Sequence, residues 1–200
     1  MSRRRLALLG KMAVSVADQA LAGVPGSPGA TPVVWASRYG DAQRSLELLR
    51  EQASAAPLSP TSFALSVHNA IGAQHSIARR MTGNALCVAA GKATVEAGLL
   101  ECMGLLAEGA PQVLLVCYDA PLPADYAPYH DEPACAYAWA WLLVAVPAEG
   151  AQRVMTLERS DTEPAGASAG LLPHGLEVLQ WALAGQGGDS GRWRWSHANA

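Results

Sequence analysis

Four cysteines are the side chains of this sequence best suited to nucleophilic or metal chemistry, at positions 87, 102, 117 and 135. Their wide spacing includes no Cys-x-x-Cys pair and no Cys/His cluster, so we expect no metal site. Cys117 follows an aliphatic run and is expected to be a small buried hydrophobe.

A second polar group consists of His68, Asn69 and His75. Two histidines seven residues apart can share one face of a helix. No Asp or Glu accompanies them, so a metal site is not expected here either. We expect His68 and Asn69 to make buried side-chain hydrogen bonds that organise a turn, and we keep both as candidate binding residues.

The third group lies in a proline-rich stretch. His130 beside Asp131 and Glu132 is the usual grouping for proton transfer. Adjacent residues on an extended chain point in opposite directions, so these three are expected to anchor a loop. Tyr126 and Tyr129 either rim a ligand opening or pack the loop, and the sequence leaves both interpretations open, with Tyr129 kept as a candidate binding residue.

Tryptophans near the end of the chain form a fourth group. Trp139 and Trp141 are two residues apart and therefore share one face of a strand. We expect them in a core or an interface first and in a pocket wall second. The segment 192–195 (RWRW) is expected to be too exposed for a core, and a contact with a dimer mate or partner is expected because Trp and Arg are preferred interface anchors.

Composition restricts the class of protein. The chain has 200 residues, of which 50% are hydrophobic and 16% charged, enough for one globular domain. A net charge of −3 gives no basic surface for nucleic acid. No apolar run reaches the roughly 18 to 20 residues of a membrane span. Arg3 to Arg5 before an apolar stretch imitates a signal peptide, but Gly10 interrupts that stretch early, so a cytoplasmic location is expected.

Hydrophobic periodicity predicts the elements that must position these residues. Helices are expected over 6–21, 41–53, 59–81, 91–108 and 172–184, and strands over 33–37, 84–88, 112–118 and 135–146. The 59–81 helix is predicted to start with Ser59 as N-cap and Pro60 in its first turn. A hairpin partner for 135–146 is expected at 153–158.

The segment 112–118 (QVLLVCY) is almost wholly aliphatic, which is typical of a strand covered by helices on both faces. We therefore expect it at the centre of the sheet. Because helices and strands intermix along the chain, the predicted class is α/β, with a mixed, mostly parallel sheet covered by helices.

Five segments taken in order resemble the N-terminal half of the β-ketoacyl synthases, in particular the short standalone group often called chain length factors. They are RRRL with GKMA near the start, SPTSF with SVHNAIG, MTGN, GKATVEAGLLE with QVLLVCYDAP, and EPACAYAWA. The resemblance covers about residues 3–146 of a single domain expected over 1–200, and 147–200 form a C-terminal extension. It implies half of a thiolase-like fold.

The resemblance also implies a role in fatty acid, polyketide or aryl-polyene-type assembly with an acyl carrier protein as partner. An active member needs a nucleophilic Cys at a helix N-terminus and two His from its C-terminal half. When the resemblance is aligned backwards from 112–118, the nucleophile position falls near Gly91 or Lys92, where the chain has no Cys. Shifting the match brings in Cys87 as a candidate nucleophile but leaves an extra residue before Gly91, so a buried structural thiol is the interpretation that we prefer for Cys87. Lys92 would be a cation at the mouth of an acyl pocket or a solvated surface lysine.

Because the sequence ends before a second half, we expect no independent condensation. The chain is predicted to act as a noncatalytic partner, without a cofactor, that pairs with itself or with a ketosynthase. Two alternatives stay open. One is a minimal acyltransferase or thioesterase with Cys87 as nucleophile and His68 as base, and the other is an unrelated small-molecule-binding or scaffold domain.

Overall fold

The computed structural model describes residues 6–24, 28–145, 154–160 and 171–198. Its elements run in the order α1 (Leu8–Leu21), β1 (Val33–Ala36), α2 (Ala42–Ala53), α3 (Pro60–Ala64), α4 (Ala70–Arg79), β2 (Ala85–Val88), α5 (Thr94–Ala107), β3 (Val113–Asp119), β4 (Tyr137–Leu143), β5 (Val154–Arg159), α6 (His174–Ala184), β6 (Gly188–Asp189) and β7 (Trp193–Ala198). Short 3₁₀ turns occupy Pro28–Ala30 and Ala124–Tyr129. Within these ranges, none of the helices is long and apolar enough to cross a bilayer.

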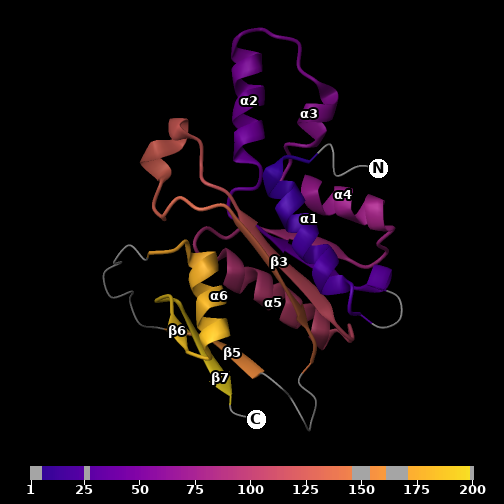
Figure 1. Cartoon of the computed structure of the whole chain (residues 1–200), viewed down its shortest axis with the longest axis vertical. Helices are drawn as coiled ribbons and strands as arrows, with labels where there is room; N and C mark the ends of the chain where they lie inside the picture. The colour runs from indigo at the N-terminus through magenta and orange to yellow at the C-terminus, as the bar shows by residue number, and fades with distance from the viewer. Residues whose placement is uncertain (1–5, 25–27, 146–153, 161–170, 199–200) are drawn as a thin grey trace.

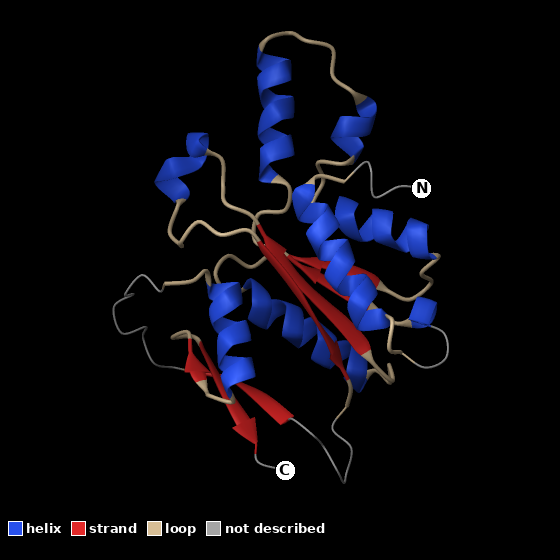
Figure 2. Ribbon diagram, viewed as in Figure 1, coloured by secondary structure: helices blue, strands red, loops and turns tan. Residues whose placement is uncertain are grey.

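A four-stranded sheet forms the centre of the molecule (Figure 2). Its strands lie in the order β2-β1-β3-β4. β1 pairs in parallel with both β2 and β3, and β4 runs antiparallel to β3. Every residue of β3 is buried. The expected α/β class with a mostly parallel sheet is therefore confirmed, and so is the internal position of 112–118.

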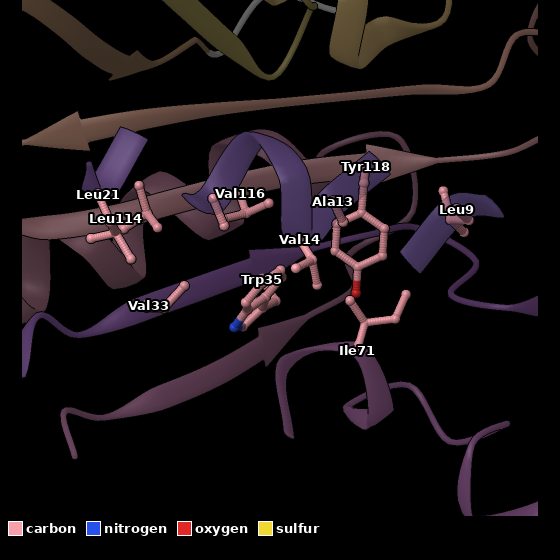
Figure 3. Packing of buried hydrophobic residues seen from close by; sticks show 11 residues of the cluster. Leu9, Ala13, Val14, Leu21, Val33, Trp35, Ile71, Leu114, Val116 and Tyr118 are labelled. Carbon is pink, nitrogen blue, oxygen red and sulfur yellow. The ribbon is translucent and has the colours of Figure 1, made fainter. Parts of the chain in front are cut away.

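Alternation along the strands divides the interior into two cores. One face of the sheet packs against α1 and α4 through Trp35, Leu114, Val116 and Tyr118 (Figure 3). The opposite face packs against α5 through the residues between them in sequence, such as Leu115. Because both faces are covered, the strands are apolar in consecutive positions rather than alternately apolar and polar.

β4 shows the same division in its side-chain sizes. Ala138 and Ala140 face the core with α1, where small side chains allow that helix to approach the sheet closely. Tyr137, Trp139 and Trp141 face the other core, with the Trp139 and Trp141 rings 4.4 Å apart. Trp139 is buried, as the sequence predicts.

A second sheet, in the order β5-β7-β6, lies beside α6 at the C-terminal end (Figure 1). The predicted hairpin between 153–158 and 135–146 is wrong, because β5 pairs antiparallel with β7. The expectation that 192–195 is too exposed for a core is also wrong at one position. Trp195 is buried against the α5 core, since β7 alternates its side chains between that core and the surface.

The helix predicted over 59–81 is divided into α3 and α4. Ser59 caps α3 as expected, accepting a hydrogen bond from the backbone of Ser62 with Pro60 in the first turn. The break lies at His68, whose ring contacts the carbonyl of Ser37 at the end of β1. This contact between distant parts of the chain outweighs the local helical preference.

Candidate functional site

Asp119 joins the carboxyl ends of β1 and β3. Its Oδ1 accepts hydrogen bonds from Ser37 Oγ at 2.8 Å and from the backbone N–H of Tyr39 at 3.1 Å. Its Oδ2 accepts from the backbone N–H of Arg38 at 2.9 Å and lies 3.5 Å from the Tyr137 hydroxyl. Burial raises the pKa of Asp119, and the bonds from the backbone of Arg38 and from Ser37 offset only part of that rise. This carboxylate fixes the direction in which the chain leaves β1.

Arg38 ties the loop before β4 to this point. Its guanidinium makes two hydrogen bonds to Asp131, at 2.8 and 2.9 Å, and lies 3.5 Å from Glu132. It also lies over the Tyr39 ring, 4.7 Å from the centroid. The hydrogen bond from Arg38 lowers the pKa of Asp131 despite partial burial. The expected anchoring of the loop by Asp131 and Glu132 is thus confirmed.

The turn before α5 carries Lys92. Gly91 has a φ of +60°, a conformation that favours glycine. Thr94 Oγ1 closes the turn by donating to the Gly91 carbonyl at 2.6 Å and accepting from the Ala90 N–H at 3.0 Å. Lys92 Nζ lies 3.4 Å from Asp131 Oδ2, with 54% of its side chain exposed. The turn and the loop therefore share one carboxylate.

Cys87 lies within β2, opposite Trp35 of β1, and packs against the α1 core. Burial raises the pKa of its thiol. A reactive thiol needs the opposite shift, which a helix N-terminus or a nearby cation provides. Burial also raises the pKa of Cys102 to about 12, and that of Cys117 well above its usual value. This geometry favours a structural thiol at position 87.

The structure separates the three polar residues that the sequence groups together. His68 Nε2 lies 2.8 Å from the Ser37 carbonyl, so the expected turn-organising hydrogen bond is present. For Asn69 the expectation of a buried hydrogen bond is wrong, because Asn69 is exposed at the start of α4 and makes no capping bond with its side chain. His75 is 1% exposed inside α4, with Nε2 3.3 Å from Asp18 Oδ1. His68 and His75 therefore have unrelated partners.

A small cavity of about 50 Å³ lies under the loop before β4. Its lining includes Tyr39, Asp119, Leu122, His130, Asp131, Glu132, Pro133, Cys135, Tyr137 and Pro173. Its volume suits a few water molecules or one small group rather than an acyl chain. Tyr129 is 69% exposed and does not line this cavity, and its role as a binding residue stays a prediction.

The sequence does not reveal the cluster around Glu96. This side chain is 0% exposed, and its Oε1 accepts hydrogen bonds from His174, Ser190 and Trp195, which all follow residue 170. A glutamate in the first turn of a helix usually stands in solvent, where it favours the helix dipole. One available signal is its position three residues before Leu99, which places it on the buried face of the helix.

The family model described as "Beta-ketoacyl synthase, N-terminal domain" matches residues 1–197. Among curated proteins, none gives a significant match to the chain.

Two solved structures are similar to the chain. The first is described as a ketosynthase (ApeO) in complex with its chain length factor (ApeC) from Xenorhabdus doucetiae. The match has 28% identity and a TM-score of 0.78, and covers 96% of this chain and 79% of the matched one. The second is described as the ishigamide ketosynthase/chain length factor, with 18% identity and a TM-score of 0.63. That match covers 78% of this chain and 50% of the other, and shows the fold alone.

Proposed function

The chain belongs to the family of β-ketoacyl synthase N-terminal domains, and we propose that it serves there as a noncatalytic partner of the chain-length-factor type. In this proposal it acts in the cytoplasm as one domain that pairs with a ketosynthase or with itself. The pair contacts acyl carrier protein in fatty acid, polyketide or aryl-polyene-type biosynthesis. The description of one similar structure as a ketosynthase with its chain length factor supports a ketosynthase as the partner.

The observation that carries the proposal is the turn before α5. The resemblance puts the family's nucleophile near Gly91 or Lys92, at the N-terminus of this helix. A thiolate there would be stabilised by the helix dipole, whereas a lysine ammonium cannot attack a thioester as a thiolate does. Lys92 is instead directed to Asp131 of the loop. Its role in the proposal is therefore to fix the loop rather than to carry an acyl group.

The open edge of β2 supports pairing. The backbone N–H groups of Val33 and Ser37 donate to the carbonyls of Asn84 and Val88, so alternate residues of β2 face β1. Between them, Ala85 and Cys87 direct their backbone groups away from β1. No described strand covers that side. An unpaired edge of this kind is a ready template for a strand from another chain.

The arm formed by α2 and α3 also supports pairing, and Figure 1 shows it standing out from the rest of the molecule. α2 carries charged residues as far as Glu51, but the rest of the arm, residues 52–64, contains no Asp, Glu, Lys or Arg. Depletion of charge is typical of interface cores. α3 buries none of its own residues, and Phe63, the single phenylalanine of the chain, is 64% exposed. A well-capped helix with an exposed aromatic ring fits a surface that another subunit covers.

Analytical ultracentrifugation tests the pairing, on the chain alone and mixed with a full-length ketosynthase from the same genome. We expect a dimer in at least one mixture. Ala85→Pro removes an N–H that faces the open edge, at a strand position that tolerates proline, and should weaken association at least tenfold. Phe63→Ser should weaken it as well.

Leu183→Ser is the matched control for the arm, because Leu183 is as exposed as Phe63 but lies on α6. It should leave association unchanged. A monomer in every sample, or equal effects of Phe63→Ser and Leu183→Ser, contradicts the proposed interface.

An activity assay tests the noncatalytic role. The isolated chain, given malonyl- and acyl-loaded carrier protein, should neither decarboxylate nor condense. Added to the ketosynthase, it should change the rate or the length distribution of the products. Turnover by the chain alone would overturn the proposal. A stoichiometric acyl adduct that disappears in Cys87→Ala would favour the acyltransferase alternative instead, which the half-buried position of Cys87 does not support.

A further inference from the structure

Glu96 connects the C-terminal unit, defined as α6, β6 and β7, to the helix that follows the Lys92 turn. Its Oε1 accepts from His174 Nε2 at 2.6 Å, from Ser190 Oγ at 3.2 Å and from Trp195 Nε1 at 3.3 Å. These donors come from α6, the turn between β6 and β7, and β7 itself. One buried carboxylate oxygen is therefore hydrogen-bonded to α6, to β7 and to the turn that joins β6 to β7.

His174 is surrounded by acidic groups. Glu96 lies against Nε2, and Glu177 lies 3.6 Å from Nδ1 on the next turn of α6. Glu132 of the loop before β4 adds a more distant negative charge. The ring also makes a T-shaped contact with Trp181, with centroids 6.0 Å apart. The imidazole thus has a carboxylate at each nitrogen and only 12% of its side chain exposed.

We propose that Glu96 and His174 form a pH-sensitive fastener, in which an imidazolium at His174 holds the C-terminal unit on α5 and its deprotonation loosens the unit. Glu96 Oε2 is buried and has no hydrogen-bond donor among the described residues, so the charge of this carboxylate depends on His174 for compensation. A buried carboxylate that loses its counter-charge is strongly unfavourable. The hydrogen bond of a neutral imidazole does not replace that charge.

The direction of the pH effect follows from proton binding. Burial on its own lowers the pKa of His174, but the hydrogen bond and charge of Glu96, with the charges of Glu177 and Glu132, outweigh it and raise the pKa above the ordinary 6.5. The closed unit therefore binds a proton more tightly than the open one. The stabilisation is complete below about pH 6.5 and is lost as the pH rises through the higher value. Opening should increase by up to about tenfold per pH unit in that window.

Hydrogen exchange of the full chain between pH 6 and 9, corrected for the intrinsic rate of each amide, measures the opening. Protection of α6 and β7 amides should fall with rising pH, while that of β3 stays constant. In His174→Gln the amide still donates to Glu96 but does not titrate, so the slope should vanish. His130→Gln, an exposed histidine in the loop before β4, should keep the wild-type slope.

Two results overturn the proposal. One is protection of α6 and β7 that does not change between pH 6 and 9 in the wild-type chain, and the other is a slope that persists in His174→Gln. If His174→Gln does not fold, a titration of the wild-type imidazole by NMR decides the matter. An imidazole pKa at or below 6.5 contradicts the fastener, and a higher one supports it.

Discussion

Ser37 Oγ lies 2.8 Å from Asp119 Oδ1, a buried hydrogen bond between residues 82 positions apart. Asp119→Ala would remove this acceptor and also leave the backbone N–H groups of Arg38 and Tyr39 without a partner. We expect the free energy of unfolding to fall by about 2–4 kcal/mol, since buried unsatisfied donors are costly. Urea denaturation measures the loss. Asp125→Ala, which breaks an exposed pair with Arg50, should cost less than about 1 kcal/mol. Equal losses in the two variants would show that Asp119 has no special structural role.

Gly72 of α4 has no room for a side chain. A Cβ there would lie 2.8 Å from two atoms of the Trp35 ring. Gly72→Ala should therefore destabilise the chain by about 1–3 kcal/mol, the usual cost of overpacking a core. A Cβ at Gly104 in α5 would meet no atom within 4 Å, so Gly104→Ala should be stabilising by about 0.5–1 kcal/mol. Guanidinium denaturation of the two variants measures the change in the free energy of unfolding, which should fall in Gly72→Ala and rise in Gly104→Ala.

His75 should make the fold less stable in mild acid. Burial lowers its pKa more strongly than the nearby Asp18 raises it, and Arg79 lowers it further. The unfolded chain thus binds the proton more tightly than the folded one. Stability is complete above about pH 6.5 and declines as the pH falls toward the lower folded value.

Urea midpoints at pH 7.5 and 5.5 should differ more in the wild-type chain than in His75→Gln. His130→Gln provides the comparison for loss of an exposed histidine and should keep the wild-type difference. A His75→Gln chain with the full wild-type pH dependence would show that another group is responsible.

The cysteines should differ in reactivity. Cys102 and Cys117 are buried on α5 and β3, and Cys87 is half-buried with a raised thiol pKa. With iodoacetamide at pH 8, Cys87 should react at least tenfold more slowly than a free thiol of ordinary pKa, and Cys102 and Cys117 only after unfolding. Peptide mass spectrometry over time gives each rate. Cys87 labelling faster than the free thiol would point to an activated nucleophile.

Much of the sheet could be predicted because its signal is local. The aliphatic run ending at Tyr118 indicates a strand covered on both faces, and β3 is buried throughout. The periodicity of 6–21 likewise predicts α1, whose inward residues include Ala13 and Ala17. Such patterns depend only on which side of one element faces the core.

The parts that escaped prediction depend on contacts between distant residues. β5 pairs with β7 across a long separation, and nothing in either strand specifies that partner. The predicted 59–81 helix is interrupted at His68, whose ring contacts the carbonyl of Ser37, 31 residues earlier. Lys92, a candidate from the sequence, does lie in an ion pair, with Asp131. The pair of Glu96 and His174 could not be predicted, because the two residues are 78 positions apart and belong to no recognisable motif.

The alternation of alanine and aromatic residues in β4 also protects the fold against mispairing. A shift of one residue in its pairing with β3 would turn Trp139 and Trp141 toward α1 and leave alanines opposite α6. The core with α1 would be overpacked and the opposite core would contain cavities, so the shifted pairing is unfavourable on both faces of the sheet. Insertions between Asp119 and β4 can be absorbed by the loop, whereas an insertion within β4 cannot. Natural length variation among relatives should accordingly stop at Tyr137.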